Sequence, residues 1–118
     1  MTKNEQREIN AQVLAFIESY NNTTNEMRCT YEPSRPLRSC SARVNYITNT
    51  ETGEILYAVL TSYSTVVAII DYATDTLYDF LRYVYGYTST SAQHISKFSK
   101  DYGSGKWGCA NTLRYYPV

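Results

Sequence analysis

The chain has 118 residues, a length that predicts a single compact domain, residues 1–118, and argues against a multidomain enzyme. Eleven Lys and Arg residues balance eleven Asp and Glu residues, so the global positive charge that drives non-specific binding to nucleic acid or anionic lipid is absent. Hydrophobic residues make up 43% and charged residues 19%, a composition that supports a packed core and argues against a mainly disordered chain.

The first ten residues, MTKNEQREIN, are polar and lack the apolar run of about 7–15 residues that a secretory signal requires. The apolar run at residues 66–70 is only five residues long. A membrane-spanning helix needs roughly 18 such residues in a row. These patterns predict a cytoplasmic protein that does not enter a membrane.

The three cysteines, Cys29, Cys40 and Cys109, are odd in number and include no C-x-x-C pair, which fits reduced thiols. With His94 they could form a Cys₃His zinc set. Structural zinc sites, however, usually pair ligands about two to four residues apart, and these cysteines are much farther apart. We therefore expect no obligatory disulfide, no metal and no cofactor.

Residues 2–20 are predicted to form an amphipathic helix. Thr2 and Glu5 have the S/T-x-x-E spacing of a capping box, in which each side chain satisfies a backbone amide of the first turn. Apolar residues then recur at intervals of three and four, at Ile9, Val13, Phe16, Ile17 and Tyr20. This stripe is expected to pack on the rest of the domain.

Residues 21–41 are predicted to be mostly loop, with a short strand near residues 27–31, because Asn, Thr and Pro are frequent and periodicity is weak. The one local cluster of positive charge in the sequence lies here or just after, at Arg28, Arg35, Arg38 and Arg43.

The sequence switches to strand patterns at residue 42. Residues 43–48 and 54–63 predict a hairpin, whose connection ends at Gly53, a residue able to take positive φ. Residues 65–72 are apolar almost throughout, which predicts a central strand buried on both faces. Residues 73–75 form a turn, and residues 76–87 are predicted to be a fourth strand. Short polar links favour antiparallel neighbours in meander order.

A second helix is predicted at residues 91–102, with the Thr90–Gln93 pair repeating the capping-box spacing and Gly103 as a left-handed C-cap. A glycine-rich loop and a terminal strand near residues 112–116 follow. The predicted fold class is therefore α+β: an antiparallel sheet of about four strands, residues 42–87, with the helices at 2–20 and 91–102 covering one face.

The stretch from Ser62 to Phe98 resembles a family of small bacteriophage and mobile-element proteins without an established activity. The likeness is carried by SYSTVVA at residues 62–68 with Asp71, by Tyr78, and by YTSTS at residues 87–91 followed by His94, Ile95 and Phe98. It implies an accessory protein acting in the cytoplasm of a bacterial host cell, in a class that includes inhibitors of CRISPR defence.

Three patterns could carry chemistry. His94, the only histidine, could act as a general base, but no nucleophile or acidic partner has a recognisable spacing, so packing beside the sheet or capping the helix is favoured. Asp71, Asp75 and Asp79 are spaced by four and could hold a divalent ion, but their place around a turn favours turn chemistry. The GSGK run at residues 103–106 follows a helix and lacks phosphate-loop spacing. We therefore expect a non-enzymatic protein.

The thirteen tyrosines are the most informative feature of the composition. Tyr is enriched at protein interfaces and can also stack on unpaired bases. Four of them, Tyr57, Tyr63, Tyr78 and Tyr83, are expected to fill the core as cross-strand partners. The predicted partner-binding residues are Tyr85, Tyr87, Tyr115 and Tyr116, with Arg35, Arg38 and Arg43.

The function expected from these patterns is binding and inhibition of a host protein, with a CRISPR effector nuclease as a specific target. The alternative is a single-stranded nucleic-acid-binding protein that stacks bases on tyrosines and neutralises phosphates with Arg35, Arg38, Arg43, Lys97 and Lys106. The zero net charge counts against this alternative. A small RNase or toxin that uses His94 would need a catalytic constellation that the sequence lacks.

Overall fold

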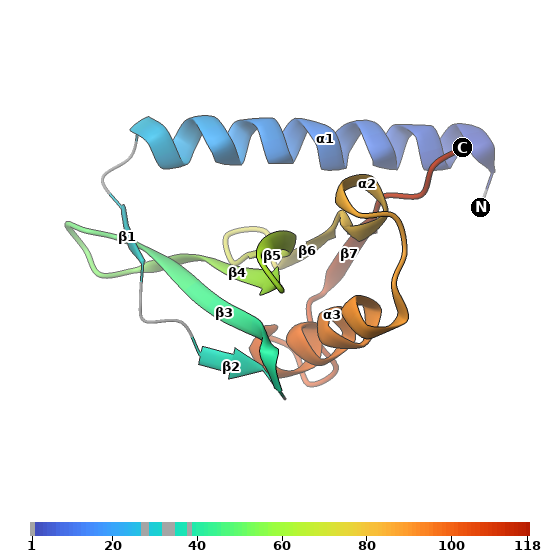
Figure 1. Cartoon of the computed structure of the whole chain (residues 1–118). Coiled ribbons are helices and arrows are strands. Elements are labelled where there is room, and N and C mark those ends of the chain that lie inside the picture. Colours follow the sequence, from blue (N-terminus) through green and yellow to red (C-terminus); the bar gives the residue numbers. More distant parts are fainter. Residues whose placement is uncertain (1, 27–28, 32–34, 38) are drawn as a thin grey trace.

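A sheet lies between two layers of helix in the computed structural model, which describes residues 2–26, 29–31, 35–37 and 39–118, with side chains at 2–22 and 42–118 (Figure 1). The elements in these residues are α1 (Lys3–Glu26), β1 (Cys29–Tyr31), β2 (Arg35–Leu37), β3 (Ser39–Asn49), β4 (Ile55–Ser62), β5 (Thr65–Asp71), β6 (Thr76–Asp79), α2 (Leu81–Val84), α3 (Ser89–Tyr102) and β7 (Asn111–Arg114). The α+β prediction is confirmed.

Strands β3 to β6 form the predicted antiparallel meander within a sheet that has seven strands in the described residues. β1 and β2 both pair with the outer edge of β3, and β7 pairs in parallel with β6 at the opposite edge. The parallel pairing of β7 was not predicted. It follows from the connection through α3, because parallel neighbours need a long crossover.

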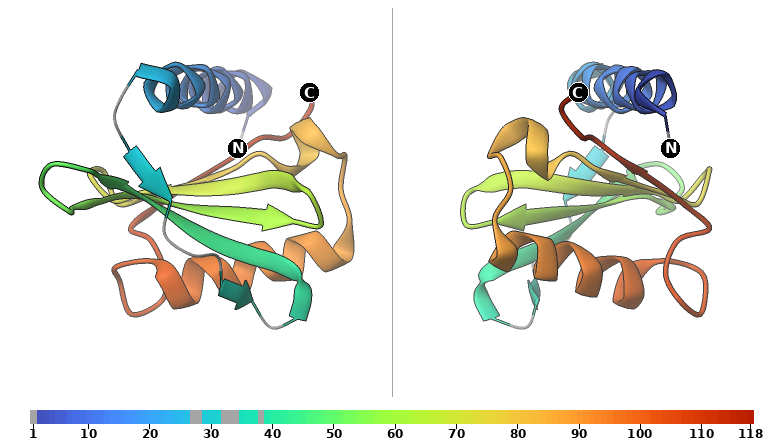
Figure 2. Two further views of the ribbon diagram at one scale, coloured as in Figure 1. Left: turned by 60° about the vertical axis from the view of Figure 1, so that its left-hand side comes forward. Right: turned by 90° about the vertical axis from the view of Figure 1, so that its right-hand side faces the viewer.

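The two long helices cover opposite faces of the sheet, so the expectation that both cover one face is wrong (Figure 2). Strand alternation explains the correction. Val59 and Ile69 point to the α1 side, whereas Leu60 and Ile70 point to the α3 side. A central strand that is apolar on both faces needs cover on both.

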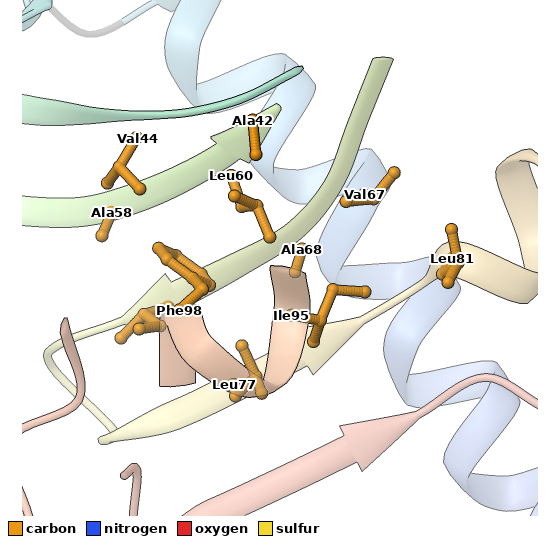
Figure 3. Close-up of a cluster of buried hydrophobic side chains, with 11 residues drawn as sticks. Ala42, Val44, Ala58, Leu60, Val67, Ala68, Leu77, Leu81, Ile95 and Phe98 are labelled. Atoms are coloured by element: carbon orange, nitrogen blue, oxygen red, sulfur yellow. The ribbon is translucent and has the colours of Figure 1, made fainter. Parts of the chain in front are cut away.

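Each face has its own core. On one side, α3 inserts Ile95 and Phe98 against Leu60, Leu77 and the other buried residues drawn in Figure 3. On the other side, the α1 stripe packs on β4 and β5, and the Phe16 ring stacks on Tyr78 with 3.7 Å between ring centroids. Tyr57 and Tyr78 are half-buried here, as predicted.

The predicted helix starts meet different outcomes. The Thr2–Glu5 capping box is formed only in part: the Glu5 amide donates to Thr2 Oγ1 at 3.1 Å, but the Glu5 carboxylate accepts from the Thr2 hydroxyl, at 3.2 Å, and not from a backbone amide. α1, however, continues to Glu26 beyond the predicted end at Tyr20. The N-cap of α3 is Thr88, whose hydroxyl accepts from the Ser91 amide, rather than Thr90.

Gly53 and Gly103 were both predicted to adopt a positive φ, and only Gly53 does so. Gly53 takes φ +73° in the β3–β4 turn, as expected. Gly103 ends α3 in an extended conformation, φ −68° and ψ 155°, so the left-handed cap is wrong. A Cβ at Gly103 would lie 2.5 Å from the carbonyl carbon of Gly108, so glycine is needed for close approach of the returning loop.

The predicted strand at residues 76–87 is wrong beyond Asp79. The Asp79 carboxylate accepts from the Leu81 amide at 3.2 Å, and one turn of helix, α2, follows. Two residues predicted for the core change environment as a result: Tyr83 is 51% exposed on α2, and Tyr63 is 65% exposed in the β4–β5 turn. A side-chain acceptor placed directly after a short strand favours a helical turn over continued extension.

Candidate functional site

A pocket of about 190 Å³ opens where α2, α3 and the C-terminal strand meet. Six of its lining residues carry aromatic or charged side chains, and we name this group the Tyr–Arg pocket: Asp79, Arg82, Tyr87, Arg114, Tyr115 and Tyr116. They come from β6, α2, the α2–α3 link, β7 and the residues after β7. Tyr87, Tyr115 and Tyr116 were all predicted as partner-binding residues, and the fold brings these three to one pocket.

Arg82 contacts two tyrosine rings. Its guanidinium carbon is 4.7 Å from the ring centre of Tyr87 and 4.6 Å from that of Tyr116. Cation–π contacts of this kind favour one placement of the guanidinium group, although Arg82 itself is exposed. Beside it, Tyr83 contacts Tyr115 edge-on at 5.2 Å.

Asp79 and Arg114 lie next to each other in the lining of the pocket. Arg114 Nε lies 3.6 Å from Asp79 Oδ2, close enough for an ion pair but long for a hydrogen bond. Burial raises the pKa of the Asp79 carboxyl, and the Leu81 amide and the guanidinium groups of Arg114 and Arg82 act against this. The pocket therefore holds one partly desolvated carboxylate and two guanidinium groups.

Side-chain amides of α1 hold the C-terminal segment in place. Asn10 Nδ2 donates to the Tyr116 carbonyl at 2.7 Å, and Asn10 Oδ1 accepts from the Tyr116 amide at 3.0 Å. Gln6 Nε2 donates both to Asn10 Oδ1 at 2.8 Å and to the Arg114 carbonyl at 3.0 Å. α1 thus positions Tyr116, which in turn positions Arg82.

A second, more open hollow continues from the pocket along α3, and we name it the lysine groove. It shares Tyr87, Ala92 and Ser96 with the pocket and adds Lys97 and Lys100. Its volume is about 620 Å³. Lys97 forms an ion pair with Asp101 at 3.2 Å, while Lys100 is exposed.

The other predicted partner-binding residues lie away from the pocket. Tyr85, 37% exposed, does not line the pocket and donates its hydroxyl to the Ser62 carbonyl at 2.7 Å. Arg43 is exposed on β3, opposite Thr61 of β4. Arg38 and the side chain of Arg35 lie outside the described residues. Tyr115 and Tyr116 line the pocket but are half-buried rather than exposed.

His94 lies in a buried polar cluster under α3. Ser62 Oγ is 2.9 Å from Ser91 Oγ and 3.4 Å from His94 Nδ1, and all three side chains are buried. This arrangement matches the interpretation of His94 as a packed histidine beside the sheet. Its burial keeps the serine and histidine side chains from a substrate in solvent.

The three spaced aspartates have separate structural contacts. Asp71 and Asp79 accept amides two residues ahead, from Ala73 after β5 and from Leu81 at the start of α2. Asp75 differs: its carboxylate accepts from the Ser104 hydroxyl and the Ala110 amide, so it ties the loop after α3 to the β5–β6 turn. Both hydrogen bonds lower the pKa of the Asp75 carboxyl, and the bond from Ser104 has the larger effect. Within the described residues, no three His, Cys, Asp or Glu side chains gather as metal ligands.

The loop that Asp75 holds presents Lys106 and Trp107 at a tight turn. The Gly105 and Gly108 amides donate to each other's carbonyls, at 2.9 and 3.3 Å. Trp107 is 82% exposed, with Lys106 Nζ 5.6 Å from its ring centre. Cys109 is half-buried and its thiol is free, while burial raises its pKa.

Arg82 and Arg114 are the site residues that sequence reasoning missed. Extending the strand to residue 87 would place Arg82 and Tyr87, five positions apart, on opposite faces of a sheet. The helical turn of α2 and the following link instead bring them into contact. Arg114 reaches Asp79 because β7 pairs in parallel with β6. No local sequence signal specifies the register of that pairing.

Comparison with protein families, curated proteins and solved structures found no match to the chain. Among the described helices, none is both long and apolar enough to span a membrane.

Proposed function

We propose that this chain is a non-enzymatic binding protein that recognises another protein through the Tyr–Arg pocket. One observation supports this most: Arg82 contacts the rings of both Tyr87 and Tyr116, and all three residues line one pocket. Tyr and Arg are among the residues that most often dominate binding energy at protein interfaces. Side chains that are already ordered lose less entropy on binding.

The proposed partner is a protein of a bacterial host cell, and a CRISPR effector nuclease is the specific target we consider. This part of the proposal depends on the resemblance carried by residues 62–98 to small phage and mobile-element proteins. The buried positions of Ser62 and His94 support a role without catalysis, because the one histidine that could act as a general base and the serine hydroxyl beside it are withdrawn from solvent.

The test is capture of host proteins on the immobilised chain, identified by mass spectrometry and repeated with variants. Tyr87→Ala and Tyr116→Ala should each weaken binding of the captured protein at least about tenfold, as expected for interface aromatics. Tyr63→Ala is the matched control, because Tyr63 is 65% exposed and lies outside the pocket. Equal loss in all three variants, or unchanged binding in the two pocket variants, would contradict the proposal.

Single-stranded nucleic acid is the second candidate ligand, and the lysine groove favours it. The exposed ring of Tyr87 lies on the same surface as Lys97 and Lys100, an arrangement that can stack a base beside phosphates. Anisotropy of labelled oligonucleotides would decide: submicromolar binding with a steep salt dependence supports this candidate. Binding no tighter than about 10 μM near physiological salt favours the protein partner.

A further inference from the structure

The guanidinium group of Arg82 contacts two tyrosine rings, whose centres lie 4.7 and 4.6 Å from its carbon. No described residue forms a hydrogen bond or a close ion pair with it, and Asp79 acts on it only as a nearby charge. The N–H donors at the edge of the group therefore remain available. Their planar fork matches a carboxylate better than any other group common on proteins.

Charges around Arg82 leave an excess of positive charge. Arg114 is the second guanidinium group of the pocket, and Asp79 is the single carboxylate beside them. The lysine groove continues the surface with Lys97, already paired with Asp101, and with Lys100, which makes no ion pair with any described residue. The combined hollow thus has cations at both ends and Tyr87 between them.

We propose that the Tyr–Arg pocket and the lysine groove together bind an extended acidic segment of the partner protein, with one carboxylate held by Arg82. This inference rests on the proposed function and specifies the chemistry of the partner. A second carboxylate along the segment meets Lys100. An extended segment of several residues spans the two hollows, which share Tyr87, Ala92 and Ser96.

Asp79 favours a peptide over a nucleic-acid strand. Its carboxylate lines the pocket beside Arg82 and can accept a hydrogen bond from a peptide amide. A phosphodiester backbone has no donor to offer to this carboxylate. The mixture of guanidinium donors and one carboxylate acceptor matches the mixture of acceptors and donors along an acidic peptide.

The experiment is an NMR titration of the isotope-labelled full chain with a hexaglutamate peptide, with hexaglutamine and a thymidine hexanucleotide as comparison probes. Hexaglutamate should shift the amide signals of Tyr87, Ser96 and Lys100. Arg82→Gln should weaken this binding at least about tenfold, and Lys100→Gln should weaken it by a smaller factor. Asp79→Asn should strengthen it, since it removes the negative charge from the pocket.

Arg7→Gln is the matched control, because it removes the same charge from an exposed site on α1 outside both hollows. Its dissociation constant for hexaglutamate should stay within about twofold of the parent. Equal weakening by Arg82→Gln and Arg7→Gln, equal binding of hexaglutamine, or no shifts at all would overturn the inference. Tighter binding of the oligonucleotide at the same amides would overturn it in favour of nucleic acid.

The two proposals can fail separately. If hexaglutamate does not bind but Tyr87→Ala and Tyr116→Ala still lose the captured protein, the pocket recognises a partner by other chemistry. If hexaglutamate binds as described while those two variants capture the partner normally, the acidic-segment site exists and the proposed function is wrong.

Discussion

Asn10 shows how one side chain can take the place of a strand. Its amide group donates to the carbonyl and accepts from the amide of Tyr116, the same two bonds that a neighbouring strand would make. A helix-face pattern predicts the apolar stripe of α1 but assigns Asn10 and Gln6 only to a polar position. Their role depends on where the C-terminal segment returns, about which the local sequence is silent.

Replacing this amide should cost stability. Asn10→Ala leaves the Tyr116 backbone groups and the Gln6 side chain without their partner in a site that is only 8% exposed at Asn10. We expect the free energy of unfolding to fall by about 1–3 kcal/mol, measured by urea denaturation. Gln12→Ala, at an exposed position of the same helix, is the control and should be nearly neutral. Equal stability of the two variants would refute the strand-like role.

Asp79 should make stability depend on pH in the unusual direction for a carboxylate. Burial raises the pKa of the folded-state carboxyl, so the folded chain binds this proton more readily than the unfolded chain. The contribution of Asp79 to stability is therefore greatest at acid pH and decreases as the pH rises through the raised pKa. Asp79→Asn retains an acceptor for the Leu81 amide.

We expect Asp79→Asn to be at least as stable as the parent at neutral pH, and its advantage to disappear in acid. Urea denaturation across this pH range measures both chains. A variant that loses stability only near neutral pH would mean that the ion pair with Arg114 outweighs desolvation.

Elements with a strong periodic signal were predicted well, and elements set by tertiary contacts were not. The α1 stripe, the β3–β4 hairpin and the central β5 follow from residue patterns that hold in any context. α2 interrupts a run of β-forming residues because the Asp79 carboxylate accepts a hydrogen bond from the amide of Leu81. β7 joins the sheet through a crossover, so its partner could not be read from neighbouring residues. The pocket depends on α2, which was not predicted, and on the parallel pairing of β7, which the predicted terminal strand did not specify.

The attachment of α1 can be tested at Phe16. Its ring stacks on Tyr78 and meets the edge of Tyr57 at 6.0 Å, so truncation leaves a gap between helix and sheet. We expect Phe16→Ala to reduce the free energy of unfolding by about 3 kcal/mol in chemical denaturation. Glu18→Ala, at an exposed position of α1, should change it little. A cost below about 1 kcal/mol would indicate that α1 is not docked as described.

At the scale of the whole molecule, two separate cores share one sheet. The α1 core and the α3 core lie on opposite faces of the sheet (Figure 2). Alternate residues of β4 and β5 contribute to each core. The C-terminal segment ties the two layers together: Tyr115 packs in the α1 core, while Tyr115 and Tyr116 line the pocket beside α3. The first and last parts of the chain are thus joined through Asn10 and Tyr116.

This architecture should fold without covalent or metal cross-links. We expect the melting temperature measured by circular dichroism to change by less than about 2 °C on adding a reductant, a chelator or both, since packing on two faces supplies the stability. A large loss with the reductant alone would reveal a disulfide. A large loss with the chelator alone would reveal a bound metal.

The exposed Trp107 has an optical consequence. It is the only tryptophan of the chain, and with 82% of its surface in solvent its indole is already hydrated in the native protein. When the indole is excited at the red edge of the absorption band, its wavelength of maximum emission should therefore scarcely change as the protein unfolds. A blue shift in the same emission, without unfolding, would instead report that something has covered the turn between Gly105 and Gly108. Trp107 fluorescence should therefore report binding at this turn and be nearly insensitive to unfolding.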